Sequence, residues 1–91
     1  MAFGAWIRSE REKAGVPLGE FARSINISTA YWSRIERGLE KAPKDSLILA
    51  ACEQLGLATD RAFIEARRLP PDMQDDIARA VSVYRAFKTP A

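Results

Sequence analysis

Two short helical segments joined by a tight turn are the feature that most constrains the fold of this chain. Apolar spacing places the first segment at residues 18–24 and the second at about residues 29–37. Asn26 lies in the turn between them, because asparagine tolerates a left-handed backbone better than most residues that carry a side chain. Ser28 suits the N-cap of the second segment, and Gly38 suits its C-terminal end.

The apolar residues of the two segments fall on faces that can meet. They are Phe21, Ala22 and Ile25 in the first segment, Ile27 in the turn, and Trp32 and Ile35 in the second segment. The small side chain of Ala22 allows the two helices to cross closely. Two short helices with this connection define a helix-turn-helix, which we place at residues 18–37.

The rest of the chain is also predicted to be helical, because no strand-like alternation is sustained and glycines and prolines interrupt helical periods. We expect further helices at residues 2–14, from Asp45 or Ser46 to Gly56, from a Thr59 cap to a point before Pro70, and at residues 72–88. The 91 residues fit one compact domain. We therefore predict an all-α fold, with a five-helix domain at residues 1–69 and an additional amphipathic helix within residues 70–91.

The composition excludes most catalytic and metal sites. Histidine is absent, which removes the commonest general base and the commonest metal ligand. Cys52 is the only cysteine, so neither a Cys/His zinc site nor an internal disulfide can form. Its helical spacing from Leu49 and Leu55 predicts a buried, inert thiol. No carboxylates stand at acid/base or metal-loop spacing. We expect no enzyme activity, no metal and no cofactor.

Membrane and export signals are also missing from the sequence. No apolar run approaches the length of a membrane span, and the first residues lack the basic start and apolar stretch of a signal peptide. A single cysteine agrees with a reducing compartment. We therefore expect the protein in the cytoplasm, without membrane contact.

Positive charge is concentrated in the first half of the chain, although the net charge is only +2. Residues 1–44 carry eight Lys or Arg and five Asp or Glu, a net of +3. Residues 45–91 carry six and seven, a net of −1. The half that contains the two short helices is thus the half that favours an anionic partner.

Further motifs surround the two short helices. They are Ile7-Arg8 with Arg11, Gly15, Glu20-Phe21-Ala22, Ile25-Asn26-Ile27-Ser28, the run from Tyr31 to Gly38, Pro43, and the stretch from Ala50 to Gly56. From about Phe3 to Leu57 the chain resembles the lambda-repressor-like, Xre-type helix-turn-helix family. The resemblance implies a five-helix DNA-binding domain that works as a dimer on a palindromic operator, with residues 29–37 in the major groove. It also implies a structural ion pair between Arg11 and Glu36.

The outer face of the second short helix carries the residues expected at DNA. Thr29, Ala30, Ser33 and Arg34 are candidates for base contact, because methyl groups suit thymine and the arginine fork suits guanine. Candidates for phosphate contact are Ser28, Tyr31, Arg37, Lys41 and Lys44. Alternatively, the arginines are solvated surface residues, Tyr31 packs on the following helix, and the lysines supply only general positive charge.

The last predicted helix carries an apolar stripe formed by Met73, Ile77, Val81, Tyr84 and Phe87. We expect this stripe to form the seam of a homodimer. The alternative is that it packs on the core of its own chain.

Together these features predict a sequence-specific DNA-binding transcriptional regulator, a dimeric repressor whose partners are double-stranded DNA and a second copy of itself. A chain of this size leaves no room for a ligand-sensing domain, so control by concentration, a partner protein or proteolysis is expected. The alternative is a protein-interaction module, an antitoxin or anti-activator that binds a partner protein through the last helix. Phage, mobile-element, restriction-system and toxin–antitoxin settings all remain open.

Overall fold

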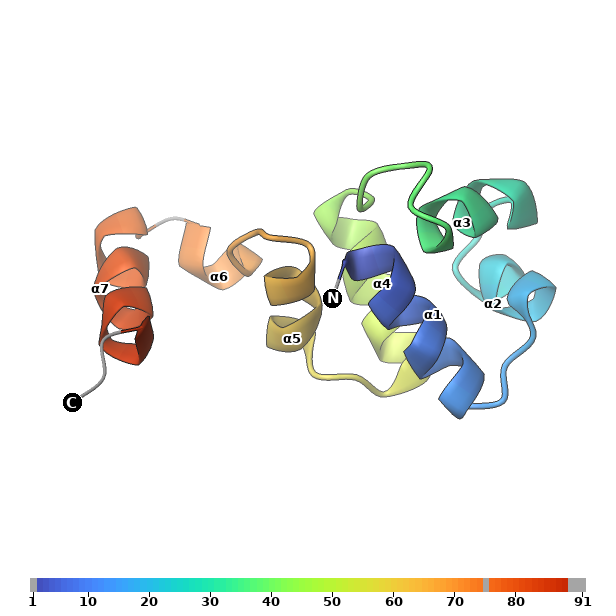
Figure 1. The fold of residues 1–91 in the computed structure, drawn as a ribbon, viewed down its shortest axis with the longest axis horizontal. Coiled ribbons are helices and arrows are strands. Elements are labelled where there is room, and N and C mark those ends of the chain that lie inside the picture. Colours follow the sequence, from blue (N-terminus) through green and yellow to red (C-terminus); the bar gives the residue numbers. More distant parts are fainter. Residues whose placement is uncertain (1, 75, 89–91) are drawn as a thin grey trace.

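The computed structural model describes residues 2–74 and 76–88, and every regular element within them is a helix. In chain order these are α1 (Phe3–Lys13), α2 (Leu18–Ser24), α3 (Thr29–Glu36), α4 (Asp45–Leu55), α5 (Thr59–Glu65), α6 (Pro71–Gln74) and α7 (Ile77–Lys88). Figure 1 shows α1–α5 gathered into one body, with α6 leading to α7, which stands apart from it. The predicted all-α fold is confirmed. No described helix has the length and apolar character needed to cross a bilayer.

One apolar core holds α1–α5 together. Its largest fully buried side chains are Trp32, Phe21, Phe63, Ile7, Ile35, Ile48 and Cys52. The rings of Phe21 and Trp32 meet with centroids 5.1 Å apart and planes tilted by 50°, a favourable arrangement for aromatic pairs. Every residue predicted for the inner faces of α2 and α3 is buried, and Ile27 packs half-buried at the turn. Phe63 of α5 completes this core.

Left-handed backbone follows each of the first five helices. It occurs at Gly15, Asn26, Gly38, Gly56 and Arg67, with φ between 59° and 76°. Asn26 therefore makes the turn between α2 and α3 in the predicted way. Arg67 was not predicted, because arginine carries no preference for this conformation. Here the Arg67 N–H donates to the Ile64 carbonyl at 3.0 Å and the Arg68 N–H donates to the Phe63 carbonyl at 2.9 Å, and these bonds close the end of α5 with a left-handed residue.

Gly4 brings α1 and α3 into direct backbone contact. A Cβ atom at this position would lie 2.0 Å from the carbonyl oxygen of Ile35 and 3.1 Å from that of Glu36. Any side chain here would push α3 away from α1. Gly4 therefore sets the distance between the two helices, a role that no pattern in the sequence marks.

Two helix starts differ from the sequence-based prediction. The helix expected at residues 72–88 is divided into α6 and α7, because Asp76 caps α7: its Oδ1 accepts the Arg79 N–H at 3.0 Å. An aspartate in this role favours a new helix start over continuation of the old one. Met73 is therefore on α6, separated from the stripe of α7. Thr59 is the first residue of α5 but not its cap, since the N-cap is Ala58 and no side chain caps this end.

Candidate nucleic-acid interface

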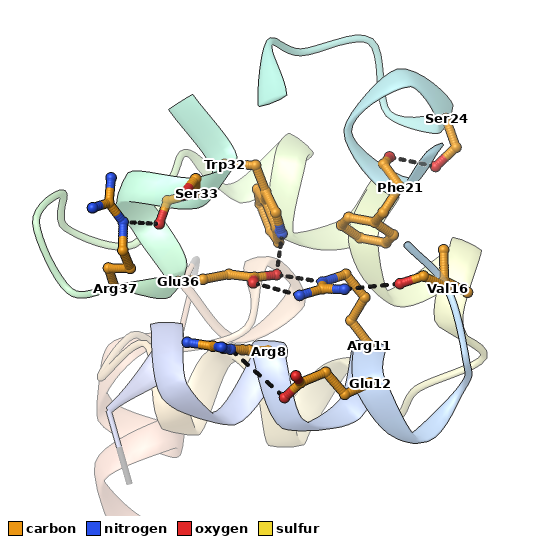
Figure 2. Close-up of polar contacts among 10 residues, drawn as sticks. All are labelled: Arg8, Arg11, Glu12, Val16, Phe21, Ser24, Trp32, Ser33, Glu36 and Arg37. Carbon is orange, nitrogen blue, oxygen red and sulfur yellow. Dashed lines mark hydrogen bonds and ion pairs between the residues drawn. The ribbon is translucent and has the colours of Figure 1, made fainter. Parts of the chain in front are cut away.

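A buried polar cluster fixes α3 against α1. Arg11 donates from Nε to Glu36 Oε2 at 2.8 Å and from Nη2 to Glu36 Oε1 at 2.9 Å, a bidentate pair (Figure 2). Trp32 Nε1 donates to Glu36 Oε2 at 2.6 Å, and Arg11 Nη1 donates to the Val16 carbonyl at 2.8 Å. Arg11 is 8% exposed and Glu36 is 6% exposed. The cluster therefore ties together α1, α3 and the turn that leads into α2.

The opposite charges of Arg11 and Glu36 are paired within the buried cluster. The hydrogen bond to Glu36 is the main cause that raises the pKa of Arg11, against the opposing effect of burial. Among the described residues, no buried side-chain nitrogen or oxygen lacks a hydrogen-bond partner. Because α3 is held by its inner residues Trp32, Ile35 and Glu36, its opposite face is left to contact something else.

The N-terminal turn of α3 presents small residues to solvent. Ser28 caps the helix by accepting the Tyr31 N–H on its Oγ at 3.1 Å. Thr29 and Ala30 are exposed beside it, and Ser33 is half-buried one turn later. The candidate base-contact residues of this turn thus share the free side of α3 with the candidate phosphate contact Ser28.

Arg34 lies folded along the helix surface instead of extending away from it. Its guanidinium carbon is 5.9 Å from the centroid of the Tyr31 ring, and its Nε is 3.4 Å from Glu40 Oε1. The side chains of Arg34 and Glu40 are 43% and 41% exposed. Sequence reasoning missed Glu40, because it lies in a loop and carries the sign of charge opposite to that expected at DNA.

Tyr31 lines a hollow between the helix-turn-helix and α4. The hollow is bordered by Ile25, Asn26, Ile27, Tyr31, Lys44, Ser46, Leu47 and Ala50. Tyr31 is half-buried there, so it combines packing toward α4 with an exposed edge beside Arg34. Lys44 borders the same hollow, so a candidate phosphate contact lies beside Tyr31.

The loop after α3 carries the remaining cationic candidates. Arg37, Lys41 and Lys44 are exposed, and Arg37 Nε lies 3.4 Å from the Ser33 carbonyl (Figure 2). All three stand on or just beyond the C-terminal end of α3. None of the three forms an ion pair with a residue that the structure describes, so their charge is suited to phosphate groups, which attract cations without regard to sequence.

Arg68, in the segment after α5, holds this loop in place. It donates to the carbonyl oxygens of Pro43 and Ala42, the latter at 2.7 Å, and its Nη1 lies 3.3 Å from Asp45 Oδ1. Gln74 Nε2 donates to the other oxygen of Asp45 at 3.0 Å. Neither Arg68 nor Gln74 was predicted, because these contacts join residues 23–29 positions apart that no local motif links.

The predicted dimer stripe lies partly on α7. Ile77, Val81 and Tyr84 are 54%, 40% and 58% exposed, and their spacing places them on one face of the helix. Met73 is half-buried on α6, and the side chain of Phe87 lies outside the described part of the chain. Figure 1 shows α7 away from the body formed by α1–α5, and none of these three residues belongs to the buried apolar core described above.

Comparison with known proteins identifies the family. The helix-turn-helix domain family matches residues 2–63, a stretch that runs from the start of α1 into α5. An uncharacterised HTH-type transcriptional regulator of Mycobacterium tuberculosis is 32% identical over 78 residues, covering 86% of this chain and 55% of the relative. The chain thus spans about half the length of that relative.

Two further relatives are ClgR proteins. The transcriptional regulator ClgR of Mycobacterium tuberculosis is 35% identical over 83 residues, covering 91% of this chain and 72% of the relative. The crystal structure of the clp gene regulator ClgR from Corynebacterium glutamicum has a TM-score of 0.63 and 32% identity, covering 90% of this chain and 88% of that chain. The chain belongs to the helix-turn-helix domain family, and the relatives that it matches are transcriptional regulators, not enzymes.

Proposed function

We propose that this chain regulates transcription by reading base edges with the exposed face of α3. The observation that carries the proposal is the division of α3 into two faces. Trp32, Ile35 and Glu36 are buried against the domain, whereas Thr29 and Ala30 are exposed at the end of the helix that enters the major groove in this class of protein. Because the inner face of α3 is anchored to the domain, its exposed face can be held in a defined register on DNA.

Within this proposal the candidate residues divide into two groups. Thr29 and Ala30 offer methyl groups to thymine, Ser33 offers a hydroxyl, and Arg34 offers two parallel donors to guanine. The residues assigned to phosphates and sugars are Ser28, Tyr31, Arg37, Lys41 and Lys44. The first group discriminates between sequences, and the second supplies affinity that depends on salt.

The operator in this proposal is a palindrome bound by a homodimer. The exposed apolar face of α7 supports a second copy as its occupant, because a palindrome is read by two recognition helices about 34 Å apart, one turn of DNA. The domain at residues 1–69 then binds DNA, and residues 70–91 join the copies. Such a dimer acts as a repressor when its operator overlaps a promoter, since it occupies the DNA that polymerase needs. We place it in the cytoplasm, where that DNA lies.

The same face supports a second candidate function. Ile77 and Val81 on a helix that stands apart from the body would also suit the groove of a different protein, as in an antitoxin or anti-activator. In that case α7 would bind the partner protein, and the wild-type chain would not form dimers by itself.

Selection of binding sites from a random duplex library tests the main proposal. We expect an enriched sequence composed of two inverted half-sites. On the enriched duplex, Arg34→Ala should weaken binding by about 1–3 kcal/mol and relax the preference at one base pair of each half-site. The matched control is Arg61→Ala, on α5 at the opposite side of the body in Figure 1, which should leave affinity and preference unchanged. Selection that enriches no sequence would refute the proposal.

A further inference from the structure

Glu40 has no place in the function described so far, although it contacts the residue assigned to base recognition. Its carboxylate meets Arg34 only through Nε, at 3.4 Å. The Nη1 and Nη2 groups of Arg34 make no hydrogen bond to any residue that the structure describes. The contact therefore occupies the side of the guanidinium that Arg11 uses toward Glu36, and it leaves open the end-on pair formed by Nη1 and Nη2.

The backbone brings Glu40 to this position. The Leu39 N–H donates to the carbonyl of Arg34 at 2.8 Å, and the Gly38 N–H donates to that of Ile35 at 3.1 Å, which are the two bonds of a Schellman motif. The Glu40 N–H also donates to the carbonyl of Arg34, at 3.3 Å. Three backbone bonds thus wrap the loop around the end of α3, so Glu40 and Arg34 meet without ordering a long stretch of flexible chain.

The ring of Tyr31 also restricts the Arg34 side chain. The guanidinium lies over the Tyr31 ring at 5.9 Å, a distance at which a cation is attracted to the ring face. Tyr31 is itself half-buried against the domain. The side chain of Arg34 is therefore held at two points, Nε by a carboxylate and the guanidinium plane by a ring.

We infer that Glu40 is a positioning residue that determines specificity through Arg34. It holds Nε and presents the Nη1 and Nη2 pair to a base edge with two neighbouring acceptors, which in the major groove means the N7 and O6 of guanine. This inference rests on the proposed role of α3 in reading DNA. A side chain ordered before binding loses less entropy on contact, which favours the sequence that uses it.

The charge of Glu40 acts in the same direction. A carboxylate at the interface is repelled by phosphates on every DNA sequence, so it lowers non-specific binding. Only a site that accepts both Nη donors compensates for this repulsion. Glu40 is therefore expected to raise binding to the selected site relative to all others, even though it lowers general attraction to DNA.

The test measures two affinities for each variant, one on the library-selected duplex and one on a mixed-sequence duplex of equal length. Glu40→Gln should weaken binding to the selected duplex and strengthen binding to the mixed one. The ratio of the two affinities should fall by about threefold to tenfold, the range expected from losing the order of one flexible side chain. Glu53→Gln, an equal change of charge at an exposed position of α4, should leave the ratio unchanged. Circular dichroism verifies that each variant is folded.

Two further variants test the length of the Glu40 side chain and its dependence on Arg34. Glu40→Asp keeps the charge but is one methylene shorter, so it should lower the ratio nearly as far as Glu40→Gln. In an Arg34→Ala background, Glu40→Gln should leave the ratio unchanged, because the residue acts through Arg34. Two results would overturn the inference. One is that Glu40→Gln lowers the affinity ratio equally in the Arg34→Ala background. The other is that Glu40→Gln alone keeps the wild-type ratio.

The outcomes also distinguish this inference from the proposed function beneath it. If the wild type shows no preference between the two duplexes, the proposed function fails. If Arg34→Ala lowers the ratio and Glu40→Gln does not, the proposed function stands and only the role of Glu40 is wrong.

Discussion

Arg11 and Glu36 show how a single buried pair can direct the packing of a small domain. A buried ion pair adds little stability relative to well-packed apolar residues, but removing one partner leaves an uncompensated charge. Here the carboxylate of Glu36 receives three hydrogen bonds, two from Arg11 and one from Trp32. Because the donors come from both α1 and α3, the cluster selects one orientation of α3 among those that apolar contact alone would permit.

Arg11→Ala should therefore lower the free energy of unfolding by about 3–5 kcal/mol, measured by urea denaturation. Glu36→Gln and the double variant complete a double-mutant cycle, in which we expect a large coupling energy. Arg8→Ala is the matched control on the same helix. Arg8 lies 3.6 Å from Glu12 in an exposed pair, so its loss should cost at most about 0.5 kcal/mol. Equal costs for Arg8→Ala and Arg11→Ala would show that the buried cluster has no special role.

The residues of the candidate site were predictable where a local pattern marks them. Ser28 as the cap of α3 follows from its place before a helical period, and the buried Trp32 and Ile35 follow from spacing. Arg68 was missed because its role depends on where distant segments meet in space. Glu40 was missed because it lies in a loop and carries the sign of charge opposite to that expected at DNA. The assignments to bases and phosphates remain predictions, since they concern a molecule that the structure does not contain.

At the level of elements, the contact between α1 and α3 requires Gly4. Glycine inside a helix is unfavourable by about 0.5–1 kcal/mol relative to alanine, so its presence in α1 has to be offset by packing. The distance of 2.0 Å that would separate an added Cβ atom from the Ile35 carbonyl oxygen supplies that reason. Backbone atoms cannot move aside as a flexible side chain can.

Gly4→Ala and Gly19→Ala should therefore have opposite effects on thermal unfolding. Gly4→Ala forces α3 away from α1 and should lower the melting temperature by several degrees, since overpacking costs about 1–3 kcal/mol. Gly19 lies in α2, where the nearest atoms to an added Cβ are side-chain atoms at 3.7 Å and 3.8 Å. Gly19→Ala should raise stability by about 0.5–1 kcal/mol through helix propensity alone. Destabilisation of equal size in both variants would contradict this explanation.

The end of α3 and the loop after it should supply affinity that is independent of sequence. Arg37→Ala and Lys44→Ala are each expected to weaken binding to selected and mixed-sequence duplexes alike. Each should also make the slope of log affinity against log salt shallower by about one unit. The measurement is a DNA titration at several salt concentrations, with Arg61→Ala on α5 as the control. A slope equal to that of the wild type would place the substituted residue in solvent.

The elements themselves were largely predictable, because their ends are encoded within a few residues. Gly15, Gly38 and Gly56 mark helix ends in the sequence and have the left-handed backbone that such ends need. The break between α6 and α7 was not predicted. The apolar period continues from Met73 to Ile77, and it hid the competing tendency of Asp76 to cap a new helix.

At the scale of the whole molecule, α7 is the element whose apolar face is not covered by the described part of its own chain. If this face joins two copies, Ile77→Glu with Val81→Glu should give a folded monomer. That monomer should bind a single half-site weakly and lose tight binding to the full palindrome, because the gain from linking two sites is lost. Sedimentation at several concentrations, beside DNA titration, measures both effects. The control is Ile64→Glu, at a 66% exposed apolar residue on α5.

Two results would count against the dimer. A wild-type chain that is monomeric at every concentration would leave α7 to a different partner, the second candidate function. A variant that unfolds would place Ile77 and Val81 in the core of their own chain, contrary to their exposure of 54% and 40%.

The separation of Arg11 and Glu36 along the chain also has a consequence for the time course of synthesis. The two residues are 25 positions apart, so at about 5–20 residues per second Arg11 is made roughly 1–5 s before its partner exists. During that interval α1, with 11 residues, is too short to be a stable helix by itself in water. Phe63, which fills the same core, is made later still. We therefore expect Trp6 and Ile7 to become fully buried only after α5 has been added, so that the domain closes in one late step instead of helix by helix.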